Sequence, residues 1–387
     1  MLMVANPCID IVAGARPNFM KVAPILRAFA EHAPACRVRL IHTGQHYDQE
    51  MSDIFFDQLG IPAPSIHLGA GSGAHGAQTA RVLAAFEEHL LRAEDPSCGA
   101  VVVGDVNSTM ACALAAVKLG IPVAHVEAGL RSFDRTMPEE INRIVTDAVS
   151  DVLFVSEPSG AENLTREGIS ADRIHYVGNV MIDSLVFSLA AARALDMPQR
   201  LGLSKAPYAY VTLHRPANVD VAARLEALVG FLKTAAHRLP ILFPVHPRTR
   251  RRLKELQLLD ELAAAPGIRL LEPLGYRESL GLMAASRVVI TDSGGVQEET
   301  TYLEVPCLTL RGNTERPATV THGTNSVVGS DLAEALDLIA AALAGRHKKG
   351  RPIPGWDGQA AKRIVRILHD AWRLSYQSAP TPQAARG

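Results

Sequence analysis

The 387-residue sequence lacks a long apolar run, an excess of charge of one sign and a secretion signal. No stretch approaches the roughly 18 consecutive apolar residues that span a bilayer. The formal net charge is −1, so no overall field attracts nucleic acid or an anionic membrane. The first residues show no basic region followed by an apolar run and a cleavage site, and we therefore expect a cytoplasmic protein.

The sequence also lacks the spacings that mark disulfide frameworks and metal sites. Its cysteines are odd in number, scattered, and without a C-x-x-C pair, so we expect them to be reduced. They are Cys8, Cys36, Cys98, Cys112 and Cys307. No H-E-x-x-H or D-x-D pattern occurs, and we expect neither a bound metal nor another cofactor.

What is present is an alternation of short β-rich runs with helical patterns, in a chain that is 48% hydrophobic and 20% charged. This order is typical of parallel sheets covered by helices. The first series of strands is predicted at Ile9–Ala13, Val38–His42, Ala100–Gly104, Pro122–Val126 and Val152–Val155. The second is predicted at Tyr208–Leu213, Ile241–Val245, Ile268–Leu271, Val288–Thr291 and Leu308–Leu310. The fold class is therefore α/β, with two doubly wound Rossmann-like domains.

The two series of strands set the expected domain boundaries. We predict an N-terminal domain over residues 1–178 and a C-terminal domain over residues 179–359. A last helical pattern within residues 360–376 follows the final strand, and we expect it to pack back on the first domain. Residues 377–387 are rich in Ala, Pro and Gln, and we expect a disordered tail.

The most informative motif is the turn that follows the strand Val288–Thr291. Ser293, Gly294 and Gly295 begin a helix there, and the glycines let backbone N–H groups approach a ligand closely. Such a helix start favours an anion, usually phosphate. An ordinary strand-to-helix turn, which also favours Gly and Ser, is the alternative.

Other polar side chains follow the predicted strands, where ligands bind in open α/β sheets. Asp105 taken singly reads more readily as a helix cap, whereas Glu127 is a poor capping residue. Glu139 and Glu140 begin a helix, where the helix dipole alone favours acidic residues. If three such carboxylates converged on one cleft, they would supply general acid and base groups.

Basic side chains occupy corresponding places and could neutralise a diphosphate without magnesium. His214 and His246 each follow an apolar strand, and each is either a structural histidine or a phosphate partner. Arginine suits bidentate contact with phosphate. The candidate cations are Arg16, Lys21, His214 and Arg316.

Taken together, these motifs resemble the non-hydrolysing UDP-N-acetylglucosamine 2-epimerases from about Ile9 to about Gly329. The matching segments are Gly14-x-Arg16-Pro17-x-x-x-Lys21, Thr43-Gly44-Gln45-His46, Gly104-Asp105, His125 to Arg131, Pro138-Glu139-Glu140-x-Asn142-Arg143, Asp292 to Glu299, and Thr314 to Pro317. The resemblance implies GT-B architecture with the active site in the interdomain cleft, and a homodimer. It implies interconversion of UDP-GlcNAc and UDP-ManNAc through elimination of UDP to 2-acetamidoglucal, in the service of surface polysaccharide synthesis.

The resemblance also implies roles for individual residues. Asp105, Glu127 and Glu139 become the acid and base carboxylates, in an order that stays open, with Arg143 and Lys21 holding charge nearby. His214 is implied to contact the diphosphate. The substrate and UDP-binding set is Arg16, His246, Ser293, Gly294, Gly295, Glu299 and Arg316, with Glu299 accepting hydrogen bonds from the ribose hydroxyls.

The chain departs from most relatives in a few places. Ala15 and Asn18 replace Thr and Glu, and Tyr47-Asp48 follows His46 in a region that binds an activating UDP-GlcNAc in allosteric members. Allosteric activation is therefore left open, as is a related sugar such as a UDP-2,3-diacetamido uronic acid. A GT-B glycosyltransferase or a sugar-nucleotide sensor are the rival classes, and neither readily explains so many carboxylates at the sugar.

Overall fold

The computed structural model describes residues 7–44, 56, 58–203, 206–372 and 374. The chain divides into two compact units, each described by itself below. Unit 1 comprises residues 1–184 and 354–387, and unit 2 comprises residues 185–353. The tail predicted over residues 377–387 and the motif residues Gln45 to Asp48 lie outside the described residues. Among the described residues, no helix is both long enough and apolar enough to cross a membrane.

Unit 1 is built on a seven-stranded sheet whose printed pairs are all parallel, in the order β3-β2-β1-β4-β5-β6-β7. Its strands are β1 (Cys8–Ala13), β2 (Arg37–His42), β3 (Ile66–His67), β4 (Ser97–Val103), β5 (Val123–Val126), β6 (Val152–Val155) and β7 (Ile174–Tyr176). Its helices are α1 (Arg16–His32), α3 (His75–Arg92), α4 (Asn107–Lys118), α5 (Pro138–Val149), α6 (Pro158–Arg166), η1 (Ala171–Arg173) and α17 (Ala360–Trp372). Helix α7 (Val180–Ala194) carries the chain from unit 1 into unit 2.

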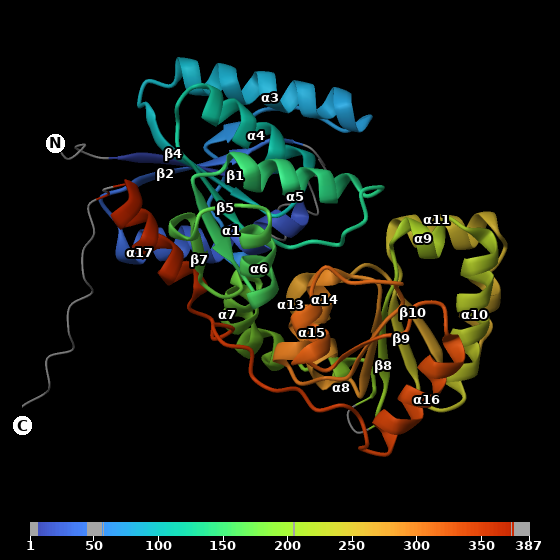
Figure 1. The fold of residues 1–387 in the computed structure, drawn as a ribbon. Helices are drawn as coiled ribbons and strands as arrows, with labels where there is room; N and C mark the ends of the chain where they lie inside the picture. The colour runs from blue at the N-terminus through green and yellow to red at the C-terminus, as the bar shows by residue number, and fades with distance from the viewer. Residues whose placement is uncertain (1–6, 45–55, 57, 204–205, 373, 375–387) are drawn as a thin grey trace, which may run out of the picture. The chain divides into compact units, whose positions relative to one another are not determined.

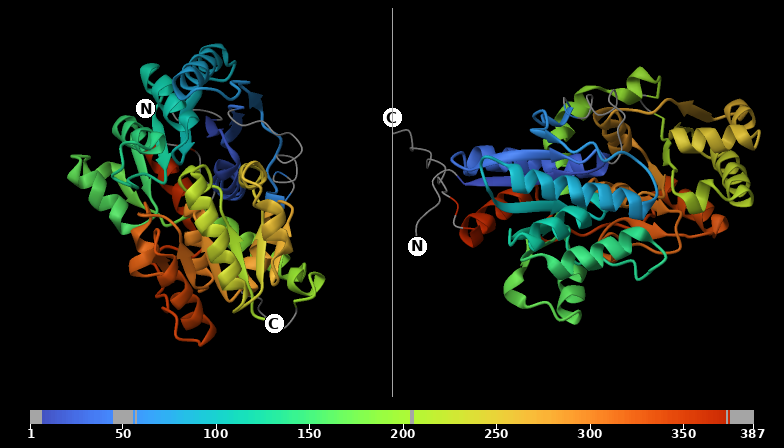
Figure 2. Two further views of the ribbon diagram at one scale, coloured as in Figure 1. Left: turned by 90° about the vertical axis from the view of Figure 1, so that its right-hand side faces the viewer. Right: turned by 90° about the horizontal axis from the view of Figure 1, so that it is seen from above.

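Helices cover both faces of this sheet, because its strands are apolar on both sides. Helices α3 and α4 lie on one face and α1 with α17 on the other (Figure 1). Helix α17, at the red end of the colour range, stays beside the blue helix α1 in further views (Figure 2). Val12, Val82, Phe86 and Val102 are almost completely buried in the core on the α3 side. Burying each such side chain contributes about 1.5–3 kcal/mol.

Unit 2 repeats the plan with a six-stranded sheet, again with parallel pairs, in the order β10-β9-β8-β11-β12-β13. Its strands are β8 (Ala209–Thr212), β9 (Ile241–Pro244), β10 (Ile268–Leu271), β11 (Val288–Thr291), β12 (Cys307–Thr309) and β13 (Asn325–Val327). Its helices are α8 (Met197–Arg200), α9 (Pro216–Val219), α10 (Ala222–Ala236), α11 (Pro247–Glu255), α12 (Leu259–Ala264), α13 (Tyr276–Ala285), α14 (Gly294–Tyr302), α15 (Pro317–Thr321) and α16 (Leu332–Leu343). Helices α10 and α16 cover one face, and α13 and α14 cover the other (Figure 1).

Every strand predicted from the sequence is present, with ends that move by a few residues. The strands that the sequence did not predict are β3, β7 and β13, each two or three residues long. All three lie at an edge of their sheet. So short a run shows no periodicity, and it is extended because the neighbouring strand supplies hydrogen bonds on one side.

Candidate active site

The carboxyl ends of β4 and β5 bring the predicted residues of unit 1 together. Val103 and Val126 are partners in the parallel ladder, so Gly104 and Glu127 leave the sheet side by side. Gly104 has a φ of 68°, and a Cβ built on it would lie 2.8 Å from Lys21 Nζ and 3.8 Å from Glu127 Oε2. The glycine therefore lets the turn that carries Asp105 close over the Lys21–Glu127 pair.

Glu127 and Lys21 form a buried ion pair between Lys21 Nζ and Glu127 Oε2. Glu127 is 4% exposed and Lys21 6%. The other carboxylate oxygen, Glu127 Oε1, is buried without a hydrogen-bond partner in the described part of the chain. Glu127 also has a φ of 72°, a left-handed conformation that costs about 1–2 kcal/mol for a residue with a Cβ. A strained, half-paired carboxylate is typical of a functional site.

Asp105 is the more exposed carboxylate, and it is held by Arg143. Arg143 Nη1 lies 2.5 Å from Asp105 Oδ2, while the guanidinium itself is almost fully buried. Its other nitrogens donate to Glu140 Oε2, at 3.0 Å from Nε and 2.7 Å from Nη2. Burial alone would raise the pKa of Glu140, but hydrogen bonds from Ser132 and Arg143 lower it. Glu140 thus holds Arg143 through Nε and Nη2, and Arg143 Nη1 contacts Asp105.

Glu139 is in the first turn of α5 but is not joined to the other carboxylates by any interaction among the described residues. It is partly buried, and it is Glu140, one residue on, that belongs to the network of Arg143. The side chain of Arg16, predicted to contact the nucleotide, lies outside what the structure describes. Its backbone begins α1.

Asn18 closes the turn that follows β1. Its Oδ1 accepts hydrogen bonds from the backbone N–H groups of Gly14 and Ala15, both at 3.0 Å. Its Nδ2 donates to the carbonyl of Val103, also at 3.0 Å. The residue that departs from most relatives therefore ties the turn after β1 to the end of β4.

In unit 2 the corresponding edge is organised by Asp292, which is completely buried after β11. Its carboxylate accepts from the backbone N–H groups of His214 and Arg215 at 3.0–3.1 Å and from Asn218 Nδ2 at 3.1 Å. Asp292 Oδ1 also lies 3.1 Å from His214 Nδ1. Burial alone would raise the pKa of Asp292, and the bonds from His214 and its neighbours lower it. Because an ionised carboxylate only accepts, His214 Nδ1 carries a proton and Nε2 faces away from Asp292.

Ser293, Gly294 and Gly295 start α14 as predicted, with Ser293 at the N-cap position. The Ser293 side chain forms no capping hydrogen bond, and the first-turn N–H groups of a helix have no partner within it. Position 294 needs glycine because the side chain of Arg316 occupies the space where a Cβ would lie. A Cβ on Gly294 would lie 2.5 Å from Arg316 Nη1.

Arg316 is buried and already paired with two carboxylates. Its Nη1 lies 2.6 Å from Glu315 Oε1, and its Nε lies 2.8 Å from Glu298 Oε1. Burial raises the pKa of Glu315, but Arg316 and Arg311 together hold it well below its usual range. The structure therefore places the Arg316 guanidinium beside Gly294 at the start of α14, where it adds positive charge to a helix end that already favours an anion.

Glu299 lies one turn into α14, nearly inaccessible, and accepts a hydrogen bond of 3.0 Å from the hydroxyl of Tyr276. Burial raises the pKa of Glu299 to about 7. His246 is the exposed N-cap residue of α11, and its Nδ1 accepts from the backbone N–H of Arg248 at 3.2 Å. Its ring centroid lies 5.5 Å from that of His214. The two predicted histidines of unit 2 are therefore neighbours.

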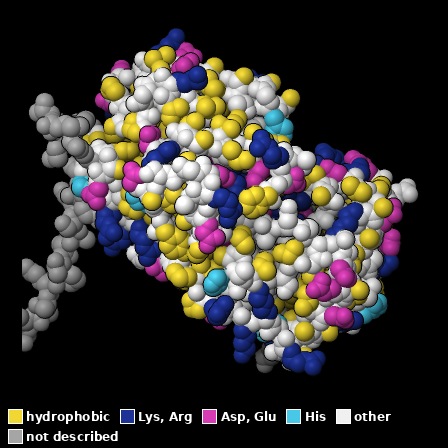
Figure 3. All heavy atoms as spheres, viewed as in Figure 1, with side chains coloured by type: hydrophobic (Ala, Val, Ile, Leu, Met, Phe, Trp, Pro, Cys, Tyr) yellow, Lys and Arg dark blue, Asp and Glu magenta, His cyan; other side chains and the backbone are white. Residues whose placement is uncertain are grey.

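Among the described residues, no three His, Cys, Asp or Glu side chains are grouped so that they could hold a metal ion. Acidic and basic side chains are interspersed over the face shown in Figure 3.

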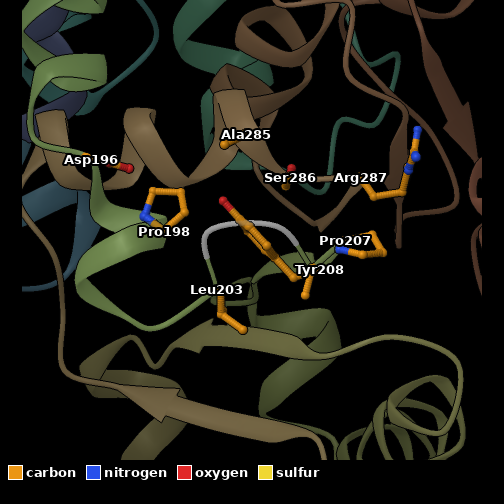
Figure 4. A pocket seen from close by; sticks show the side chains of 9 residues that line it. Asp196, Pro198, Leu203, Pro207, Tyr208, Ala285, Ser286 and Arg287 are labelled. Atoms are coloured by element: carbon orange, nitrogen blue, oxygen red, sulfur yellow. The ribbon is translucent and has the colours of Figure 1, made fainter.

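A cavity of about 440 Å³ in unit 2 contains none of the predicted residues (Figure 4). Tyr208 and Arg287 line it immediately before β8 and β11, at the edge of the sheet opposite Asp292.

Sequence reasoning missed the residues that hold the predicted ones in place. Asp292 was quoted within a motif without a role of its own, and Tyr276 was not considered. Spacing allows Arg143 to pair with Glu140 at i,i+3 or with Glu139 at i,i+4 and does not choose between them, and the hydrogen bond from Asn142 to the Asp105 carbonyl joins residues distant in sequence. The available signal was position: each lies directly after a strand or at the start of a helix.

The chain is similar to known proteins over most of its length. The family model described as UDP-N-acetylglucosamine 2-epimerase matches residues 28–369. A UDP-N-acetylglucosamine 2-epimerase of Methanocaldococcus jannaschii is 43% identical over 93% of this chain and 98% of its own. A UDP-2,3-diacetamido-2,3-dideoxy-D-glucuronate 2-epimerase of Pseudomonas aeruginosa is 40% identical over 92% of this chain and 98% of its own.

A solved structure is similar over the same extent. The M. jannaschii UDP-GlcNAc 2-epimerase in complex with UDP-GlcNAc and UDP matches with a TM-score of 0.84 and 42% identity, over 94% of this chain and 99% of that one. The predicted α/β fold with two parallel sheets and the predicted resemblance are both confirmed, whereas the roles of single residues stay predictions. The chain belongs to the family of UDP-N-acetylglucosamine 2-epimerases.

Proposed function

We propose that this protein interconverts UDP-GlcNAc and UDP-ManNAc by inverting the configuration at C2 of the sugar. The observation that carries the proposal is the pair of carboxylates at adjacent strand ends. Glu127 is buried with one free oxygen beside Lys21, and Asp105 is partly exposed beside Arg143. Two carboxyl groups with different surroundings are suited to divide acid and base roles.

The reaction balances without an oxidant or reductant. A base removes the C2 proton while the C1–O bond breaks, and the bonding electrons leave with UDP. The products are the neutral 2-acetamidoglucal and anionic UDP, and a proton delivered to the other face of C2 allows UDP to add back at C1. The order in which Asp105, Glu127 and Glu139 exchange these protons stays open.

UDP is a dianionic or more highly charged leaving group, so it needs cations and N–H donors that stabilise it as it departs. We assign this role to the edge of unit 2. The first-turn N–H groups at Gly294 and Gly295, the Ser293 hydroxyl and the outward Nε2 of His214 bind the diphosphate, with His246 beside them. Glu299 accepts hydrogen bonds from the ribose hydroxyls, and Arg316, beside Gly294 at the helix start, contacts the nucleotide.

The test is proton exchange in D2O. Incubation with UDP-GlcNAc is expected to place deuterium at C2 of both UDP-GlcNAc and UDP-ManNAc, with traces of 2-acetamidoglucal and UDP released. Nuclear magnetic resonance and mass spectrometry follow all four species. Substrate that stays unlabelled after long incubation contradicts the proposal for this sugar.

A second candidate substrate is a UDP-2,3-diacetamido uronic acid, because the P. aeruginosa relative named for that sugar is almost as similar as the M. jannaschii enzyme. The same chemistry at C2 applies to both sugars. A panel of UDP-sugars in the D2O assay separates them, since only a true substrate exchanges its C2 proton at a useful rate.

We also infer that the enzyme works in the cytoplasm as a homodimer. All five cysteines are free, and four of them are buried, as expected of a protein that folds under reducing conditions. The assembly follows from the family resemblance. Light scattering coupled to gel filtration measures its mass directly, and a mass near the 41.5 kDa of one chain contradicts the dimer.

A further inference from the structure

Four ionisable side chains form a closed network beneath the carboxyl edge of the sheet in unit 1, and none of them has a role in the proposed chemistry. His125 and Asp147 are 0% and 1% exposed. His125 Nδ1 lies 2.6 Å from Asp147 Oδ1, and Arg131 Nη1 lies 2.8 Å from Asp147 Oδ2. Arg131 also forms two bonds of 2.6–2.7 Å with the carboxylate of Glu167. The side chains of His125, Asp147 and Arg131 are almost completely buried, and Glu167 closes the network at its partly exposed end.

The ring of His125 is held from both sides. Its Nε2 lies 2.8 Å from the carbonyl oxygen of Gly104, which can only accept, so Nε2 carries a proton. Burial alone would raise the pKa of Asp147, but His125 and Arg131 lower it. His125 therefore uses both ring nitrogens to tie the turn before Asp105 to Asp147.

Asp147 ties down the second turn. Its Oδ2 accepts a hydrogen bond of 3.0 Å from the backbone N–H of Gly129, two residues after Glu127. Glu127 and Gly129 have φ values of 72° and 78°, so the turn is left-handed at two positions. Gly129 also lies directly against the carbonyl of Gly160, which leaves no space for a side chain.

We infer that His125 and Asp147 are positioning residues that fix the separation of the Asp105 and Glu127 carboxylates. One hydrogen bond from the network reaches the peptide before Asp105, and another reaches the turn that holds Glu127 in its strained conformation. The inference rests on the proposed function, because it assumes that both carboxylates move protons at C2.

This role has a consequence that a merely structural role does not share. The 2-acetamidoglucal intermediate is trapped only if a proton donor stands at the correct place when UDP adds back. When the spacing of the carboxylates relaxes, re-addition slows and more glycal escapes per epimer formed. A variant that is simply less folded loses both products in proportion, so its ratio of glycal to epimer stays constant.

The chain offers a matched control for Asp147. Asp10, in the middle of β1, is also completely buried and paired with an arginine and a histidine. Arg39 lies 2.7 Å from its carboxylate, and His89 lies 3.5 Å away. Asp10 belongs to the same sheet but bonds to neither the turn at Gly104 nor the turn at Gly129. Asp147→Asn and Asp10→Asn therefore remove the same charge from similar surroundings.

The experiment measures, for wild type and both variants, the glycal released per UDP-ManNAc formed from UDP-GlcNAc, together with urea unfolding. Asp147→Asn is expected to raise the ratio by about tenfold or more, as for displaced catalytic groups, and Asp10→Asn to leave it unchanged. A folded Asp147→Asn enzyme with the wild-type ratio overturns the inference, and so does an equal rise in both variants.

A second variant keeps the test decisive if Asp147→Asn does not fold. His125→Gln retains a donor on β5 but loses the imidazole ring whose two nitrogens form both bonds, and the same rise in the ratio is expected. A wild-type ratio in folded His125→Gln overturns the inference. If the wild-type enzyme itself exchanges no deuterium at C2 of any UDP-sugar, the proposed function fails first, and the two failures are distinguishable.

Discussion

The carboxyl edges of the two sheets use carboxylates in opposite ways. In unit 1, Glu127 and Asp105 lie at the edge itself, each beside a cation that is more than nine-tenths buried. In unit 2, Asp292 is turned inward and saturated by four donors, so that His214 and the helix start face outward. Unit 1 presents acidic groups that can exchange protons, whereas unit 2 presents donors that can hold an anion.

The difference indicates which half of a nucleotide sugar each edge is suited to bind or to act on. A carboxylate with an unpaired oxygen can take a proton, and a carboxylate whose oxygens are all occupied cannot do so readily. Backbone N–H groups and a histidine ring favour phosphate oxygens. The comparison therefore predicts that variants in unit 1 change turnover and variants in unit 2 change the binding of UDP.

The largest effect is expected for the carboxylates of unit 1. Glu127→Gln and Asp105→Asn keep shape and hydrogen bonding but cannot exchange protons in the same way. Each should lower kcat by about 10²-fold to 10⁴-fold, the range for loss of a general acid or base. UDP affinity, measured by calorimetry, should stay within about threefold, which is less than 1 kcal/mol.

Glu167→Gln is the control for this pair, because Glu167 lies in the same unit and is paired with Arg131 at a partly exposed position. Its kcat should fall far less. If Glu127→Gln weakens UDP binding as much as it lowers kcat, the prediction that unit 1 governs turnover and unit 2 governs UDP binding is wrong.

The next effect tests whether the position of Lys21 matters and not only its charge. Gly104→Ala would place a Cβ 2.8 Å from Lys21 Nζ, so the lysine must move away from Glu127. We expect kcat to fall by about 10²-fold, since a displacement of about 1 Å at a catalytic group has that cost. The measurement is kcat with UDP-GlcNAc beside the free energy of unfolding.

Gly120 provides a matched control, with a φ of 73° and open space where a Cβ would stand. Gly120→Ala carries the same backbone strain of about 1–2 kcal/mol without touching Lys21. The two variants should lose similar stability and differ in kcat. Equal kcat values would show that the close fit at Gly104 has no catalytic role.

Much of this comparison could be read from the sequence, for a physical reason. Parallel strands are buried on both faces, so their apolar runs are plain, and the residues after them must meet at one edge. That reasoning found Asp105, Glu127, His214 and Ser293. It missed the edge strands β3, β7 and β13, whose two or three residues carry no pattern.

The pairing of charges could not be read in the same way. Glu139 and Glu140 are adjacent and chemically alike, and only the rotation of α5 decides that Glu140 meets Arg143. Arg316 was predicted to contact the nucleotide, and the sequence did not show that it would also be paired with Glu298 and Glu315 beside Gly294. Such partners are set by tertiary packing, because residues distant in sequence decide which side of a helix is enclosed.

A third prediction concerns the pH dependence of unit 2. Burial raises the pKa of Glu299 to about 7, above its ordinary value of 4.5. A carboxyl group with a raised folded-state pKa contributes stability below pH 4.5 that is lost as the pH rises through about 7. Glu299→Gln removes this dependence, so relative to wild type it should gain about 1–3 kcal/mol between pH 5 and pH 8.

Urea unfolding at the two pH values measures this difference. Glu304→Gln, a variant in the turn directly after the same helix, is the control and should show no comparable gain. A wild-type pH dependence in Glu299→Gln would mean that the carboxyl group is ionised throughout this range. Its hydrogen bond with Tyr276 would then link Tyr276 to a permanent charge.

The smallest effect separates two roles of His246, which caps α11 and lies beside His214. Asn is a good N-cap residue and Ala is a poor one, so His246→Ala should cost about 0.5–2 kcal/mol of stability and His246→Asn much less.

Neither variant keeps an imidazole. If His246 meets the diphosphate, both should weaken UDP binding by a similar factor, about threefold to tenfold for one hydrogen bond of 0.5–1.5 kcal/mol. If it is only a cap, UDP affinity should follow helix stability, and His246→Asn should bind UDP as the wild type does. Calorimetry with UDP alone decides between the two, because it leaves the sugar and the carboxylates of unit 1 out of the measurement.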